Sequence, residues 1–192
     1  MINLSEWFAL QTRPRCEKAV EYALTRKGYE CLLPTYQKNQ ILSHRQVKAT
    51  LPLFPTYIFC RFNQEAVGKA ILTPGVRRII EFGGRPATLQ ANEINALQRL
   101  AGADLLRRPW SYVPDGTLVQ IRTGPLSGVE GLVSMHEDRE HLIITVSLLQ
   151  QSVIVQLDEN TVFSIIKEPK RRIERKIETD YDYSDLALKL LK

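Results

Sequence analysis

The chain has 192 residues, 44% of them hydrophobic, which is enough for one large core or two small ones. No apolar run approaches 18 residues, and the start lacks a basic segment followed by an apolar one, so we expect no membrane span, no secretion signal and a cytoplasmic location. The net charge of +5 divides into +8 for residues 1–110, −5 for 111–166 and +2 for 167–192. A basic segment beside an acidic one suggests two different partners, with nucleic acid the expected partner of the first.

The first half of the chain alternates between strand and helix patterns. Residues 7–10 predict a buried strand, and Thr12 is a plausible N-cap for a helix that Gly28 ends. Residues 36–48 are polar and predict an exposed hairpin or loop. Aromatic and β-branched residues favour a central strand over 57–62. The remaining patterns predict a strand at 30–33, a short helix at 64–72, a strand at 76–82 and a helix at 92–100.

The second half predicts short strands only. Prolines, arginines and weak periodicity predict a linker over 106–114, and the charged residues 167–192 form a separate tail. Gly131 lies inside a strand pattern, which indicates a bulge or a close backbone approach. Between linker and tail, a small five-stranded barrel is expected from strands at 118–122, 129–135, 141–148, 152–157 and 161–165.

Catalytic and metal-binding patterns are not convincing in this sequence. Cys16, Cys31 and Cys60 are odd in number, widely spaced and lack a CxxC pair, which predicts reduced thiols. The histidines do not join them in a metal-ligand cluster, and no Ser/His/Asp order, paired acidic motif or phosphate loop is apparent. We therefore expect a protein that is not an enzyme and has no cofactor. We also expect a monomer.

The segment Gly-Pro-Leu-Ser-Gly at 124–128, flanked by two alternating strands, resembles a KOW motif. Three further blocks resemble NusG-like transcription factors: Trp-Phe-Ala-Leu at 7–10, Pro-Leu-Phe-Pro-Thr-Tyr-Ile-Phe at 52–59, and Thr-Pro-Gly-Val at 73–76 with Phe-Gly at 82–83. The resemblance implies an α+β N-terminal domain of the NGN type over 1–105, with an antiparallel sheet flanked by helices. An all-β KOW barrel over 115–166 follows the linker.

Some residues resemble specialised members of the family more than general NusG. The run at 12–15 and the run at 81–87 look like those of UpxY, LoaP and RfaH types. Two positions depart from the family pattern. Thr56 stands where glycine is usual, and a β-branched residue there is not expected to have a positive φ. Pro74 stands near a DNA-contacting arginine of RfaH types, so that DNA readout is not carried over.

The resemblance implies a factor that binds the clamp helices of transcribing RNA polymerase and promotes elongation or antitermination. By position, the expected polymerase-binding residues are Trp7, Phe54, Pro55 and Tyr57. The rigid turn at Phe54-Pro55 is expected to hold Phe54 near the surface, where a large aromatic can anchor a helix. The alternative is that these aromatics are core residues.

Basic residues of the first half are expected to face upstream DNA or nascent RNA. Arg13 and Arg15 lie near a helix N-terminus, where cations do not stabilise the helix. Arg77 and Arg78 are neighbours in a strand and must point to opposite faces, so only one can join the others. The expected set is Arg13, Arg15, Lys69 and Arg77 or Arg78, and the alternative is a solvated basic surface.

The acidic barrel is expected to bind a protein, since it has too few cations for a phosphate backbone. In NusG and RfaH the KOW domain recruits a small-subunit ribosomal protein or Rho, which implies contacts from Val129, Leu148 and Leu149; core packing is the alternative for the first two. A second hypothesis follows from the charges: the acidic barrel docks on the basic domain and hides the polymerase site until recruitment, which is an autoinhibited two-state switch. RfaH types refold the barrel segment as helices, but the β-branched residues at 143–146 and 153–155 predict that this barrel stays β. The rival function, a ribosome-associated KOW protein that binds RNA structurally, favours a basic barrel.

Overall fold

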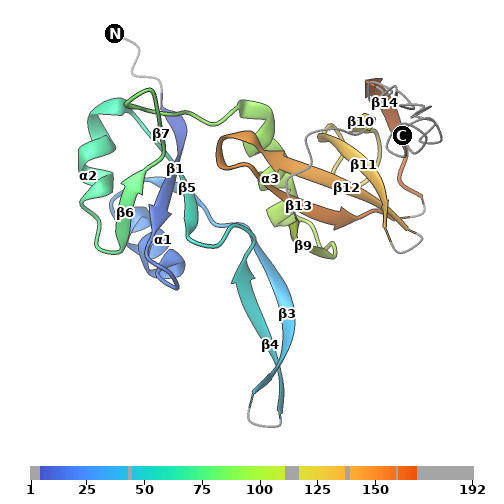
Figure 1. Ribbon diagram of the computed structural model, residues 1–192, viewed down its shortest axis with the longest axis horizontal. Helices are drawn as coiled ribbons and strands as arrows, with labels where there is room; N and C mark the ends of the chain where they lie inside the picture. Colours follow the sequence, from blue (N-terminus) through green and yellow to red (C-terminus); the bar gives the residue numbers. More distant parts are fainter. Residues whose placement is uncertain (1–4, 43–44, 111–116, 137–138, 159, 168–192) are drawn as a thin grey trace, which may run out of the picture.

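The computed structural model of the chain describes residues 5–42, 45–110, 117–136, 139–158 and 160–167 (Figure 1). The expected tail, apart from Lys167, and residues 111–116 of the expected linker lie outside these ranges. The described helices and strands form an α+β unit, a projecting hairpin and a second all-β sheet. None of the described helices has the length and apolar character needed to cross a membrane.

The first unit is built on a four-stranded antiparallel sheet with the order β2-β5-β1-β6. Its strands are β1 (Glu6–Thr12), β2 (Glu30–Leu32), β5 (Tyr57–Phe62) and β6 (Val76–Ile79). Helices α1 (Glu17–Arg26) and α2 (Val67–Ile71), with the short 3-10 helix η1 (Gln64–Ala66), belong to the same unit. The expected antiparallel sheet with flanking helices is therefore present.

Alternation along the central strands separates two apolar faces. Phe8 and Leu10 of β1 pack with Ile58 and Cys60 of β5 in a cluster that also holds Val20 and Leu24 of α1 and Ala70 of α2. Ala9 and Phe59 point to the other face and join a second cluster. Period-2 alternation in the sequence thus gives each face its own core.

Helix α1 begins later than the sequence predicts. Thr12 is the last residue of β1, and its buried hydroxyl has no hydrogen-bond partner among the described residues, so the predicted N-cap is wrong. The capping position is Cys16, whose side chain makes no capping bond. Arg15 just before it has φ 64°, so the chain turns between strand and helix before α1 starts. Gly28 follows the helix with φ 84°, as predicted for its end.

A long hairpin and a short one extend from the first unit. Strands β3 (Thr35–Leu42) and β4 (Arg45–Pro52) pair throughout, and Figure 1 shows them projecting away from both sheets. This confirms the exposed hairpin predicted for the polar segment. Strands β7 (Glu81–Phe82) and β8 (Arg85–Pro86) form the short hairpin, and helix α3 (Ala91–Gly102) follows it.

The second sheet has six strands rather than the predicted five, in the order β14-β10-β11-β12-β13-β9. The extra strand is β9 (Arg107–Trp110), which lies in the segment expected to be a linker and pairs with β13. Because β9 is an edge strand, Pro109 is tolerated there despite its missing N–H. The other strands are β10 (Thr117–Ile121), β11 (Glu130–His136), β12 (Arg139–Val146), β13 (Gln151–Gln156) and β14 (Phe163–Lys167).

Gly131 lies in β11 where the backbone of β12 comes close. A Cβ at this position would meet the carbonyl oxygen of Ile143 at 2.6 Å and Cδ1 of Leu142 at 2.9 Å. The close backbone approach predicted from the sequence is therefore confirmed. No side chain larger than hydrogen fits here without displacing backbone atoms.

Helix α3 connects the two units. One continuous cluster of buried side chains contains Phe59 of the first sheet, Ile94 and Leu97 of α3, and Leu142 and Val153 of the second sheet. Polar contacts reinforce this packing: the N–H of Ser147, which begins 3-10 helix η2 (Ser147–Leu149), donates to Oε1 of Glu93 at 2.9 Å. The only ion pair between described residues, Arg61–Glu30, lies within the first unit.

Candidate functional site

The turn before β5 forms the centre of the predicted polymerase-binding segment. Thr56 has φ 67°, so the expectation of a negative φ is wrong. Its N–H donates to Oε1 of the buried Glu17 at 2.8 Å, and its carbonyl accepts from the N–H of Thr12 at 2.8 Å. These two hydrogen bonds hold a β-branched residue in a conformation that normally favours glycine.

Phe54 is buried rather than held near the surface. Its side chain is 1% exposed and packs edge-on against Phe59, with ring centroids 5.4 Å apart. The core alternative is therefore correct for this residue. Pro55, directly after it, is exposed. At this rigid turn Pro55, and not Phe54, faces solvent.

Trp7 and Tyr57 are half-buried and share one face of the first sheet. Both pack against the cluster that contains Ala9 and Phe59. Tyr57 lies opposite Gln11 in the β1–β5 ladder, whereas Trp7 lies opposite Arg61 near the other end of β1. The structure therefore brings Pro55 and Tyr57 together at one end of the sheet and leaves Trp7 at the other.

The paired arginines of β6 separate as predicted. Arg77 lines a surface depression together with Arg13, Pro14 and Val76. Arg78 instead lies opposite Gln11 in the β1–β6 ladder, and its Nε donates to Oε1 of Gln11 at 2.9 Å. The structure therefore assigns Arg77, and not Arg78, to the group that contains Arg13.

The other members of the basic set are exposed but differ in their surroundings. Arg15 is exposed two residues beyond Arg13. Lys69 lies in the last turn of α2, where its carbonyl accepts a hydrogen bond from Nζ of Lys27 at 3.2 Å. Nζ of Lys27 also donates to Oγ1 of Thr73 at 2.7 Å, so a cation outside the predicted set lies beside Lys69.

The projecting hairpin adds cations that lie outside the predicted basic set. Lys38, Arg45 and Lys48 are exposed on β3 and β4. No acidic residue occurs between Glu30 and Glu65, so the whole hairpin is free of negative charge. That gap in the acidic residues is the sequence signal that would have identified this basic arm.

The residues predicted to bind a partner through the second unit lie near the junction with α3 or in the core. Val129 is 3% exposed and is a core residue. Leu148 and Leu149 are half-buried members of η2, next to the Ser147 N–H that donates to Glu93. Within the part of the chain that the structure describes, no three His, Cys, Asp or Glu side chains are grouped as metal ligands.

The sequence is also similar to known protein families. The family model described as "Transcription termination factor nusG" matches residues 5–98, and the transcription termination/antitermination protein NusG of Rickettsia prowazekii (strain Madrid E) is 22% identical over 173 residues, covering 83% of this chain and 90% of that protein. The chain is NusG-like, and the family model covers its first half. This family consists of transcription termination and antitermination factors.

Two solved structures are also similar to this chain. A structure described as "Domain interaction in Thermotoga maritima NusG" is 22% identical, covers 80% of this chain and 93% of its own, and has a TM-score of 0.45. A crystal structure of the MjSpt4:Spt5 complex is 16% identical and has a TM-score of 0.30. The match covers 85% of this chain and 96% of that one.

Proposed function

We propose that this NusG-like protein binds transcribing RNA polymerase at the clamp helices and promotes elongation or antitermination. The observation that carries the proposal is the exposed Pro55 and half-buried Tyr57 at one end of the first sheet, with Trp7 on the same face as Tyr57. Partly exposed aromatic side chains on a rigid sheet are suitable anchors for a partner helix.

We further propose that the protein is a specialised paralogue directed to particular operons. Its support is the exposed basic turn at Arg13 and Arg15 and the exposed β7–β8 hairpin, the two segments that resemble specialised members. In this proposal residues 1–105 form the NGN domain, and Arg13, Arg15 and Arg77 face upstream DNA or nascent RNA.

In the same proposal the six-stranded sheet is a KOW domain that binds a protein partner, such as a small-subunit ribosomal protein or Rho. Strands β14 and β9 end the described sheet, and an edge strand can accept an added strand from a partner. Leu148 and Leu149 are half-buried beside α3, so their contact with a partner would require that this junction open.

The Tyr57→Ala variant is expected to weaken binding to RNA polymerase about 10- to 30-fold, because truncation of a partly buried aromatic anchor costs the complex most of that side chain's contact. Binding is measured by a polymerase pull-down with purified protein, followed by in vitro elongation across a terminator. Read-through should fall in parallel with binding.

The matched control is Tyr22→Ala, which removes a tyrosine that is 64% exposed on α1. It should leave binding and read-through unchanged. Failure of the wild-type protein to bind polymerase, or equal losses in both variants, would contradict the proposed function.

Charge reversal of Arg13 and Arg77 is expected to flatten the salt dependence of binding to an elongation complex. Each cation that contacts a phosphate contributes about 1 to the slope of log K against log salt, because its contact releases counterions. The slope is measured by titrating salt in a binding assay with nucleic acid upstream of the polymerase.

Arg78→Glu is the control for this pair, since Arg78 bonds Gln11 and does not line the depression that holds Arg13 and Arg77. Its slope should match that of the wild type. An unchanged slope in the Arg13→Glu, Arg77→Glu variant would show that these residues do not contact phosphate.

A further inference from the structure

Two cysteines lie opposite each other on neighbouring strands of the first sheet. Cys31 of β2 pairs with Cys60 of β5 in the antiparallel ladder, and their Sγ atoms are 3.4 Å apart. Directly opposed residues of an antiparallel pair have Cα atoms about 4.5–5.5 Å apart, within the window that a disulfide requires. The two sulfurs can therefore bond through side-chain rotation, without a shift of either strand.

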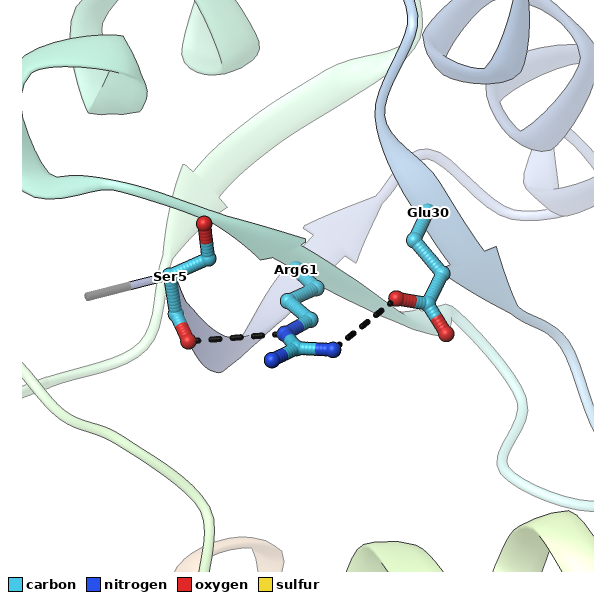
Figure 2. A network of polar contacts seen from close by, with 3 residues as sticks. All are labelled: Ser5, Glu30 and Arg61. Carbon is cyan, nitrogen blue, oxygen red and sulfur yellow. Dashed lines mark hydrogen bonds and ion pairs between the residues drawn. The ribbon is translucent and has the colours of Figure 1, made fainter. Parts of the chain in front are cut away.

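Contacts at the neighbouring pair of the β2–β5 ladder support the register that places the two cysteines opposite each other. Glu30 lies opposite Arg61, and Figure 2 shows the guanidinium of Arg61 between the carboxylate of Glu30 and the carbonyl of Ser5. Arg61 Nη1 lies 3.4 Å from Oε2 of Glu30, and its Nε donates to the Ser5 oxygen at 3.4 Å. These exposed contacts are individually weak, but they connect β2, β5 and the start of β1 next to the cysteine pair.

The two thiols differ in accessibility and acidity. Cys31 is half-buried and Cys60 is fully buried. The hydrogen bond between Cys31 and Cys60 lowers the pKa of Cys31, against the opposing effects of burial and of Glu21 and Glu30. The hydrogen bond to Cys31, followed by burial and the Cys31 charge, raises the pKa of Cys60. The accessible sulfur is thus the better nucleophile of the two.

We propose that Cys31 and Cys60 form a reversible oxidation site, in which Cys31 reacts with a hydroperoxide and Cys60 completes a disulfide. In the first step the Cys31 thiolate attacks one peroxide oxygen, the O–O bond breaks, and a sulfenic acid and hydroxide form. In the second step the Cys60 sulfur attacks the Cys31 sulfur, the S–O bond breaks, and the Cys60 proton leaves with that oxygen as water.

The electrons balance across these steps. Two thiols lose two electrons to the peroxide, and a pair of small-molecule thiols returns them by thiol–disulfide exchange. Conversion of Cys31 to a neutral sulfenic acid also removes the negative charge that opposes ionisation of Cys60. The first step therefore prepares the second thiol for attack.

The disulfide would close a loop that contains the whole basic hairpin. Strands β3 and β4 lie between Cys31 and Cys60 in the chain, and β2 is the three-residue edge strand from which the chain enters that hairpin. Oxidation would therefore fix the base of the hairpin covalently to the centre of the sheet. A crosslink of this kind stabilises chiefly by restricting the unfolded chain.

The test treats the reduced full chain with hydrogen peroxide, alkylates the remaining thiols and maps the peptides by mass spectrometry. The expected product is an intramolecular Cys31–Cys60 crosslink that a dithiol reverses, with a rise in melting temperature of about 5–10 °C. In the Cys60→Ser variant the oxidation should stop at a sulfenic acid on Cys31, which dimedone traps. Cys16→Ser is the matched control and should form the crosslink normally.

Absence of the crosslink in the oxidised wild-type protein would overturn the proposal, and this measurement needs no variant. Dimedone labelling of Cys60 in a Cys31→Ser variant, at the rate seen for Cys31, would contradict the assigned roles. A crosslink that involves Cys16, or a melting temperature that rises equally in Cys31→Ser, would also overturn it.

Discussion

The Phe54→Ala variant is expected to lose about 3–5 kcal/mol of unfolding free energy, the usual cost of truncating a buried phenylalanine. Phe54 is 1% exposed and packs edge-on against Phe59, so its removal leaves a cavity in the cluster that continues through α3 into the second sheet. Urea denaturation followed by circular dichroism measures the loss.

The matched control is Phe82→Ala, because Phe82 is 85% exposed in the short β7–β8 hairpin. Its unfolding free energy should stay within about 0.5 kcal/mol of the wild type. A similarly small loss for Phe54→Ala would mean that its ring is at the surface. Loss of polymerase binding in Phe54→Ala reports on folding, which is why Tyr57 is the better probe of the interface.

The Gly131→Ala variant is expected to lose about 1–3 kcal/mol of unfolding free energy, because the new methyl group overpacks the sheet. Its Cβ would lie 2.6 Å from a backbone oxygen, that of Ile143, and backbone atoms cannot move aside as a flexible side chain can. The same denaturation measurement applies, and amide exchange in β11 and β12 should increase.

Gly68→Ala provides the comparison, since a Cβ at Gly68 in α2 meets no atom within 4 Å. Alanine there is expected to stabilise the protein by about 0.5–1 kcal/mol, because glycine loses more backbone entropy in a helix. Equal effects of the two substitutions would mean that the strand approach at Gly131 is looser than described.

Local patterns were enough to place most elements but not their ends or partners. Alternation and helical spacing predicted β1, α1, β5 and the polar hairpin. The predicted start of α1 is wrong because Thr12 is a residue type that favours N-caps, whereas its backbone continues the ladder of β1. Strand β9 is not predicted because its prolines and arginines favour a linker, and only pairing with the distant β13 makes it a strand.

The site was harder to predict because its geometry depends on residues far apart in the chain. The positive φ of Thr56 is supported by Glu17, which lies 39 residues earlier, so no local pattern could reveal it. The sequence showed that Arg77 and Arg78 face opposite ways, but only the pairing of Arg78 with Gln11 decides which one joins Arg13. Burial of Phe54 likewise follows from packing across units.

Helix α3 couples the stability of two sheets that share no strand. Ile94, Leu97 and Leu100 are buried in a cluster that contains residues of both sheets. Unfolding of either sheet would therefore expose these side chains of α3 to water. Heat is therefore expected to unfold both units in one cooperative transition, with equal calorimetric and van't Hoff enthalpies. An N-terminal fragment that ends near residue 105 would expose the apolar face of α3 to solvent. Such a fragment is expected to be less soluble than the full chain, even though its own sheet is complete.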